Sequence, residues 1–193
     1  MSCKILLIDG HPDAESFCAA LAAEYVAGAQ ERGREVKRVT LRELKFDPLL
    51  HYGYRQPQEL EPDLIKVQAL IKECTHLVLV TPVWWGSLPG LLKGFIDRTF
   101  VRDFSHRFDP KKKLPEKLLR GRSVTTIYTQ SSPWWYTKFI IGENFWRTLR
   151  RSIFDFVGFA PVQRFYFDKV KGSSPERRQE MLARCRELGR RGA

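Results

Sequence analysis

The sequence predicts a doubly wound α/β fold, in which a parallel sheet carries helices on both faces. Short, mostly apolar runs alternate along the chain with longer segments whose apolar residues recur at helical spacing. Parallel neighbours need helical crossovers, so this alternation is typical of a parallel sheet. The chain has 193 residues, 43% of them hydrophobic and 28% charged, which suits one compact domain over residues 1–193.

Each predicted element follows from a local pattern. The predicted strands are residues 5–9, 36–41, 77–80, 124–129 and 163–167. The predicted helices begin near Ser16, Pro62, Ser87, Phe145 and Pro175, the last with a cap at Ser173 or Ser174. Serine accepts a bond from an early helical N–H, and proline suits the first helical turn. The second strand alternates apolar and basic residues, so we expect it at an edge, and residues 45–62 and 103–122 predict long connections.

The charge is strongly basic, with a formal net charge of +11 and a pI near 9.7. The excess is spread over several segments and forms no single stripe. It is interpreted as solvated surface, as a means of steering an anionic dinucleotide, or as a contact for an acidic partner. Because no nucleic-acid recognition motif accompanies the charge, nucleic-acid binding is not predicted.

Cysteines and terminal segments indicate a cytoplasmic protein. Cys3, Cys18, Cys74 and Cys185 are scattered, with no C-x-x-C pair and no histidine at zinc-binding spacing. We therefore expect reduced thiols and no metal site. The N-terminus runs directly into an apolar strand, and no apolar stretch approaches the length needed to span a bilayer.

Ligands of doubly wound folds bind beyond the carboxyl ends of the strands, so the loops after the first, third and fourth strands are the candidates. The first loop, residues 9–17, ends at a helix N-terminus, which favours a phosphate. His11 and Ser16 can add side-chain donors. Alternatively, Ser16 is only a helix cap and His11 only a turn residue.

The second and third loops are rich in aromatic residues. Trp84 and Trp85 lie in the second loop, residues 81–90, and they form either a flat wall for a planar ring or part of the core or of a dimer interface. In the third loop, residues 129–136, Trp134 and Trp135 leave the same choice between ring and subunit contact. We expect the two loops to face one another and to leave a slot suited to flavin mononucleotide.

Four motifs give the chain a resemblance to the flavodoxin-like NAD(P)H:quinone oxidoreductases, which include small bacterial quinone reductases and potassium-efflux ancillary flavoproteins. The motifs are Gly10-His11-Pro12 with Ser16-Phe17, Phe46-Asp47-Pro48, the segment from Pro82 to Asp97, and Phe156-Val157-Gly158-Phe159. The resemblance covers most of the chain. It implies a five-stranded sheet of order 2-1-3-4-5.

The same resemblance implies a non-covalent flavin, FMN or alternatively FAD. The cofactor-binding residues it predicts are His11, Ser16, Phe17 and Cys18 near the phosphate or ribityl chain, Pro82, Val83, Trp84, Trp85 and Gly86 beside the ring, and Thr129, Gln130, Ser131 and Ser132 after the fourth strand. Ser131 and Ser132 replace two glycines usual in the family. Tyr136 is the candidate catalytic residue, aligned only loosely with the family's tyrosine.

The implied reaction is a ping-pong, two-electron transfer from NAD(P)H through the flavin to a quinone or another aromatic acceptor. The family also implies a homodimer. An alternative function is a regulatory flavoprotein that binds a membrane transporter at the membrane surface, with incidental reductase activity. A one-electron carrier is disfavoured, because flavodoxins of that kind are acidic and have a different phosphate loop.

Overall fold

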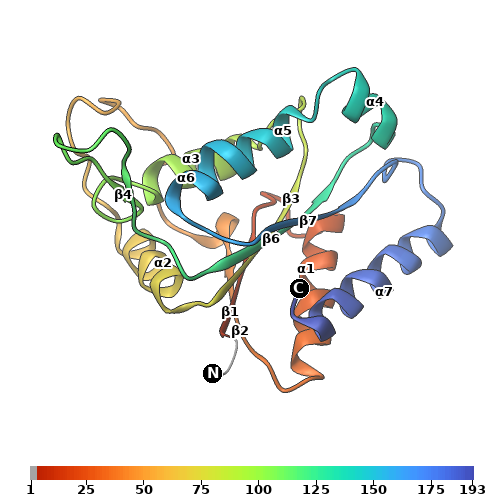
Figure 1. Cartoon of the computed structure of the whole chain (residues 1–193). Coiled ribbons are helices and arrows are strands. Elements are labelled where there is room, and N and C mark those ends of the chain that lie inside the picture. The colour runs from red at the N-terminus through yellow and green to blue at the C-terminus, as the bar shows by residue number, and fades with distance from the viewer. Residues whose placement is uncertain (1–3) are drawn as a thin grey trace.

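A parallel five-stranded sheet forms the centre of the protein in the computed structural model, which describes residues 4–193 (Figure 1). Its strands are β1 (Lys4–Asp9), β2 (Glu35–Thr40), β3 (His76–Pro82), β6 (Ser123–Thr129) and β7 (Val162–Phe167). Their order is β2-β1-β3-β6-β7, and every neighbouring pair is parallel. The predicted fold class, the strand order and the edge position of the second strand are confirmed.

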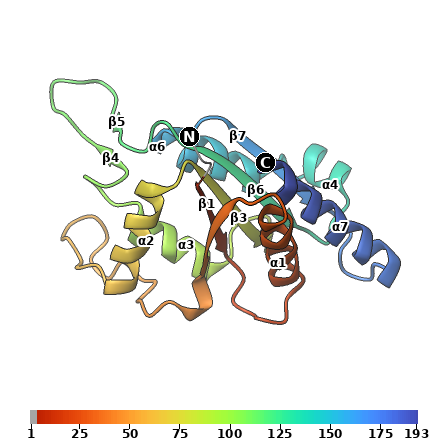
Figure 2. The same ribbon diagram turned by 90° about the horizontal axis from the view of Figure 1, so that it is seen from below.

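Two long helices cover one face of the sheet, as Figure 2 shows. They are α1 (Phe17–Gln30) and α7 (Pro175–Arg191), which begin at the predicted caps Ser16 and Ser174. The two helices cross so closely at Gly28 that a Cβ atom built there would lie only 1.9 Å from the carbonyl oxygen of Arg186. A glycine is required at this crossing.

The other face is covered by the remaining long helical segments and holds the larger apolar core (Figure 1). These segments are α2 (Pro62–Glu73), α3 (Gly90–Thr99), and a continuous run of α5 (Asn144–Arg147), the π-helical η2 (Thr148–Phe154) and α6 (Asp155–Val157). The run matches the predicted helix near Phe145. Its π-helical turns were not predicted, because apolar spacing does not separate π from α winding.

Short elements account for most differences from prediction. They are the 3₁₀ turn η1 (Leu41–Glu43), the small antiparallel pair β4 (His106–Arg107) and β5 (Glu116–Lys117), and helix α4 (Trp134–Phe139). Residues 134–136 were expected to lie in the third loop. They instead form a helix that follows Pro133, and its first amide, from Trp134, donates to Asp168 at 2.9 Å. Six residues are too few to show a helical period.

Helix α3 starts three residues later than expected, because Ser87 closes a tight turn with Trp84 instead of capping the helix. Within the described residues, Cys18, Cys74 and Cys185 are free thiols, and Cys3 lies outside them. Across residues 4–193, no helix combines the length and the apolar character needed to cross a membrane.

Candidate functional site

A cavity of about 440 Å³ opens beyond the carboxyl ends of β3 and β6. Residues from the second and third predicted loops and from the segment between α4 and α5 line it: Val83, Trp85, Gly86, Tyr128, Gln130, Ser131, Ser132, Thr137, Ile141, Glu143, Asn144, Phe145 and Trp146. Its volume lies in the usual range of small-molecule sites, which is roughly 300–1,000 Å³. The two loops therefore face one space, as predicted.

The loop after β1 leads into the N-terminus of α1 and offers backbone donors. The Ser16 hydroxyl accepts the Ala19 amide N–H at 3.2 Å, which confirms Ser16 as the helix cap. The amides of Phe17 and Cys18 donate to no group within residues 4–193. The guanidinium of Arg178 lies 5.6 Å from the centre of the Phe17 ring. Free N–H groups, the helix dipole and a nearby cation together favour an anion here.

Asp9, the last residue of β1, fixes the start of this loop. Its side chain is fully buried and accepts bonds from Arg38 and Arg42, both at 2.9 Å. It also accepts the His11 amide at 3.3 Å, and Arg42 donates to the His11 carbonyl at 3.3 Å. A buried carboxylate is stable only when it is paired and hydrogen-bonded, and here its partners tie the backbone of His11 to β1 and η1.

The His11 ring stands at the junction of the first two loops. Its Nδ1 accepts the Asp13 amide N–H at 3.0 Å, so a neutral ring carries its proton on Nε2. Partial burial lowers the pKa of His11 below its ordinary value, although Asp13 and Asp9 oppose the shift. The ring contacts Trp84 edge-on, with centroids 5.5 Å apart. A neutral His11 thus offers its Nε2–H as a donor at the junction of the first and second loops.

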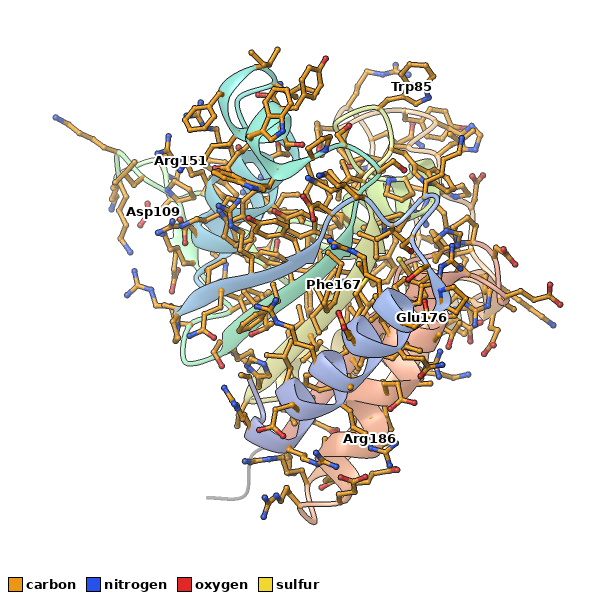
Figure 3. The ribbon with its side chains drawn as sticks, turned by 90° about the vertical axis from the view of Figure 1, so that its right-hand side faces the viewer. Trp85, Asp109, Arg151, Phe167, Glu176 and Arg186 are labelled. Carbon is orange, nitrogen blue, oxygen red and sulfur yellow. The ribbon has the colours of Figure 1, made fainter. Side chains whose placement is uncertain are left out.

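The second loop is a two-residue turn with unusual backbone angles. The backbones of Trp84 and Ser87 exchange hydrogen bonds of 3.1 and 2.8 Å, and the residues between them, Trp85 and Gly86, have φ of 51° and 68°. Positive φ at both positions is the pattern of a type I′ turn. Trp85 is held at its tip, fully exposed, in a conformation that side-chain-bearing residues rarely adopt (Figure 3).

The Gln130 side chain fixes the conformation of the third loop. Its side-chain amide donates to the Ser132 carbonyl at 3.0 Å and to the Thr137 hydroxyl at 3.1 Å. Neither Ser131 nor Ser132 has a positive φ, so serine fits this backbone without left-handed strain, although the family usually has glycine. The amides of Trp85, Gly86, Ser131 and Ser132, all residues that line the cavity, donate to no group in the described chain.

The predicted site residues divide by position. Val83, Trp85, Gly86, Gln130, Ser131 and Ser132 line the cavity, and His11, Ser16, Phe17 and Cys18 belong to the first loop. Trp84 packs on His11, and Pro82 and Thr129 end buried strands. The Cys18 thiol shares a hydrogen bond of 3.3 Å with Thr129, and burial raises its pKa to about 12. Cys18 can therefore serve a ligand only through its backbone.

For the tryptophans of the two aromatic loops, the structure excludes a place in the core and leaves the ring and subunit contacts as alternatives. Trp84, Trp85, Trp134 and Trp135 are all exposed, so none of them is a core residue. Tyr136 lies in α4, packs edge-on against Trp135 and is not among the residues that line the cavity. A catalytic role for Tyr136 stays a prediction.

Sequence reasoning missed a cluster of three polar side chains beside the cavity, Tyr128, Glu143 and Arg164. Glu143 forms an ion pair of 2.8 Å with Arg164, and Arg164 also donates to the Tyr128 hydroxyl at 3.4 Å. Burial raises the pKa of Tyr128 to about 12. Tyr128 and Arg164 lie in strands that the sequence assigns to the sheet, and Glu143 has a positive φ between two short helices. No spacing in the sequence signals that these three side chains meet.

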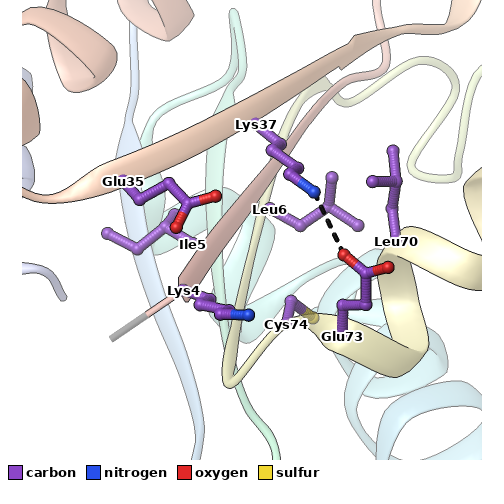
Figure 4. Close-up of a pocket in the computed structure, with 8 residues that line it drawn as sticks. All are labelled: Lys4, Ile5, Leu6, Glu35, Lys37, Leu70, Glu73 and Cys74. Atoms are coloured by element: carbon purple, nitrogen blue, oxygen red, sulfur yellow. Dashed lines mark hydrogen bonds and ion pairs between the residues drawn. The ribbon is translucent and has the colours of Figure 1, made fainter. Parts of the chain in front are cut away.

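A second hollow lies at the opposite, amino-terminal end of β1 (Figure 4). Lys4, Leu6, Leu70 and Cys74 are among its lining residues, and the ion pair between Lys37 and Glu73 crosses it at 3.0 Å. Its volume of about 10 Å³ holds at most about one water molecule. It is not a candidate site.

Comparison with known sequences identifies the family. Residues 3–188 match the family described as having a flavodoxin-like fold. The chain belongs to this family. The resemblance of this flavodoxin-like protein to the NAD(P)H:quinone oxidoreductases is thereby confirmed.

Two curated relatives match almost the whole flavodoxin-like chain. An uncharacterized NAD(P)H oxidoreductase of Haemophilus influenzae is 25% identical over 182 residues, which cover 92% of this chain and 89% of the relative. The mouse ribosyldihydronicotinamide dehydrogenase [quinone] is 26% identical over 208 residues, which cover 93% of this chain and 87% of the relative.

Solved structures give the same fold. An NAD(P)H:quinone oxidoreductase from Methanothermobacter marburgensis has a TM-score of 0.82 at 17% identity and covers 100% of both chains. An FMN-dependent NADH-azoreductase from Bacillus anthracis, in complex with FMN, has a TM-score of 0.71 at 18% identity and covers 99% of both chains. At these identities the likeness establishes the fold alone.

Proposed function

We propose that this protein is a cytoplasmic, flavin-dependent NAD(P)H:acceptor oxidoreductase that reduces a quinone or a similar aromatic acceptor. The observation that carries the proposal is the cavity of about 440 Å³, which lies between the two predicted ring-binding loops of a flavodoxin-like sheet. The names of the relatives, an NAD(P)H oxidoreductase and a quinone-dependent dehydrogenase, support the reaction class.

The residues present fit a flavin. In the first loop, the amides of Phe17 and Cys18 and the Nε2–H of His11 would hold its phosphate. At the cavity, the unpaired amides of Trp85 and Gly86 and those of Ser131 and Ser132 would bond the polar edge of its ring. FMN is proposed over FAD, and the Bacillus anthracis azoreductase of the same fold, which is in complex with FMN, supports this choice. The bound flavin would supply two-electron hydride chemistry.

The protein's own residues would position the reactants and exclude water. Gln130 fixes the third loop, so the amides of Ser131 and Ser132, which line the cavity, would be held in place before a ligand binds. Preorganised N–H donors stabilise negative charge that develops on a bound ring. Thr137 and Ile141 line the cavity from the segment that includes α4, and this segment would shield the ring from solvent.

The proposed reaction converts NAD(P)H, a proton and a quinone into NAD(P)⁺ and a hydroquinone. The nicotinamide and the acceptor would occupy the same part of the cavity in turn, which gives ping-pong kinetics. The fully exposed Trp85 and the exposed side chains of α4, among them Trp135 and Phe139, would be covered by a second copy in a homodimer. Light scattering after size-exclusion chromatography tests the dimer separately.

The purified protein, mixed with FMN or FAD and freed of excess ligand, tests the proposed function. We expect stoichiometric FMN binding and turnover of NADH or NADPH with 2-methyl-1,4-naphthoquinone. Initial rates should give parallel lines in double-reciprocal plots at several acceptor concentrations. Failure to retain either flavin would refute the proposal, and intersecting lines would refute the ping-pong order.

A further inference from the structure

A small annex extends the cavity behind the ring-binding loops. Its volume is about 100 Å³, and its lining residues are Tyr128, Gln130, Trp134, Thr137, Lys138, Glu143, Arg164 and Tyr166. Tyr128, Gln130, Thr137 and Glu143 also line the main cavity, so the two spaces adjoin. A substituent of a planar ligand in the main cavity can therefore extend into the annex.

Arg164 is the dominant polar group of the annex. Its Nη1 forms an ion pair with Glu143 at 2.8 Å and donates to the Tyr128 hydroxyl at 3.4 Å. Its Nε and Nη2 donate to no group within residues 4–193. The guanidinium therefore keeps two nitrogens, with three N–H groups between them, for a ligand.

Aromatic rings hold this guanidinium in place. Its central carbon lies 5.0 Å from the Trp146 ring centre and 5.8 Å from that of Tyr166. The Arg164 side chain is only 26% exposed, so its charge is screened less than that of a surface arginine. A planar fork that is already ordered loses little entropy when it binds a planar anion.

The charges that line the annex leave room for an anion. Arg164 and Lys138 contribute two cations, and Glu143 contributes the one carboxylate among the lining residues. Glu143 is fixed beside Arg164, because its own amide donates to the Thr137 carbonyl at 2.9 Å. It competes with an incoming anion for the same guanidinium without neutralising the whole annex.

We propose that Arg164 binds a carboxylate or sulfonate carried by the aromatic acceptor, so that the enzyme prefers anionic aromatic acceptors. This inference rests on the proposed function, since it names the substrate class of the same cavity. Charge-assisted bonds from an arginine fork to an oxyanion are about twice as strong as neutral ones. Arg164 would act as a specificity residue, and Glu143 would set how strongly it attracts the anion.

A purely structural role for Arg164 makes a different prediction. If the Glu143–Arg164 pair only braced the segment before α5, removing either partner would weaken the binding of all ligands alike. If Arg164 binds an anion, the two changes should act in opposite directions on an anionic ligand. They should also leave a neutral ligand of the same shape nearly unaffected.

Naphthalene-2-sulfonate and its neutral isostere naphthalene-2-sulfonamide are the probes. Calorimetric titration of the FMN-loaded protein should show the sulfonate binding about tenfold more tightly. Arg164→Gln should abolish this preference, and Arg164→Lys should retain part of it through charge alone. Glu143→Gln should raise the preference about threefold, because a competing carboxylate is removed.

Equal binding of the two probes to the wild-type protein would overturn the inference. So would parallel losses for both probes in Arg164→Gln and Glu143→Gln. The readout requires no turnover, so a protein that binds flavin but lacks reductase activity still reports on it. If no flavin is retained, the same titration on the chain alone separates failure of the proposed function from failure of the anion site.

Discussion

Two arginines, Arg38 and Arg42, pair with Asp9, and comparing their variants separates the contribution of the first loop to flavin binding from an effect on the stability of the fold. Arg38 and Arg42 each donate to the same buried carboxylate oxygen at 2.9 Å. Only Arg42 also donates to the His11 carbonyl, at 3.3 Å. We expect Arg38→Met and Arg42→Met both to destabilise the fold, and Arg42→Met alone to impair flavin binding strongly.

The magnitudes follow from these contacts. A hydrogen bond to a charged group contributes about 1.5–3 kcal/mol, and a neutral one about 1 kcal/mol. Either variant leaves Asp9 one guanidinium, so Arg38→Met should lower the free energy of unfolding by about 2 kcal/mol. Arg42→Met also releases the His11 carbonyl and should lower it by about 3 kcal/mol. Disorder of the His11 loop should weaken FMN binding about tenfold, which corresponds to about 1.4 kcal/mol.

Urea unfolding of the flavin-free protein and fluorescence titration with FMN measure the two effects independently. Arg38→Met serves as the matched control and should change the Kd for FMN less than about twofold. Equal weakening of FMN binding in the two variants would refute the assignment of Arg42 to the loop. Unchanged binding in both would show that the loop needs no anchor.

Two further predictions concern the scaffold. Burial lowers the pKa of His76 to about 4, so the unfolded chain takes up a proton first as the pH falls from about 6.5 towards 4. The free energy of unfolding should be highest above that range and should drop by on the order of 3 kcal/mol across it. His76→Gln should flatten the pH profile of urea unfolding, and a profile that keeps its slope in this variant would contradict the assignment to His76. Gly28→Ala should destabilise the fold by about 3 kcal/mol, because its Cβ meets the Arg186 carbonyl at 1.9 Å. Gly90→Ala is the control in chemical unfolding, since its Cβ would meet nothing within 4 Å, and an equal loss in both variants would contradict the close crossing of α1 and α7.

The sequence predicted those elements whose patterns are local. Ser16 and Ser174 cap helices at the expected residues, and the alternation in residues 36–41 correctly indicated an edge strand. The loops after the first, third and fourth strands met at one edge because parallel strands share their direction. Short elements escaped prediction, since the six residues of α4 carry no period and the cap from Asp168 lies 34 residues away.

The cluster of polar side chains beside the cavity shows what sequence patterns cannot reveal. Glu143 directly precedes α5, and Phe145 and Trp146 of α5 contact Tyr128 and Arg164 on two neighbouring strands, so the three side chains meet through this packing. Each residue alone has an ordinary local explanation, as strand or loop. Similarly, the sequence marked Trp84 and Trp85 as a pair, but the type I′ turn sends one to His11 and the other to the tip of the loop. Only the backbone geometry separates their roles.

The most direct test of the central claim is anaerobic mixing of the FMN-loaded protein first with NADPH or NADH and then with 2-methyl-1,4-naphthoquinone. We predict that one nicotinamide bleaches the visible absorbance of the bound flavin with a stoichiometry of one, and that the quinone restores it in a separate step. A bound flavin that neither nicotinamide reduces, or a reduced flavin that the quinone does not reoxidise, would contradict the proposed oxidoreductase function.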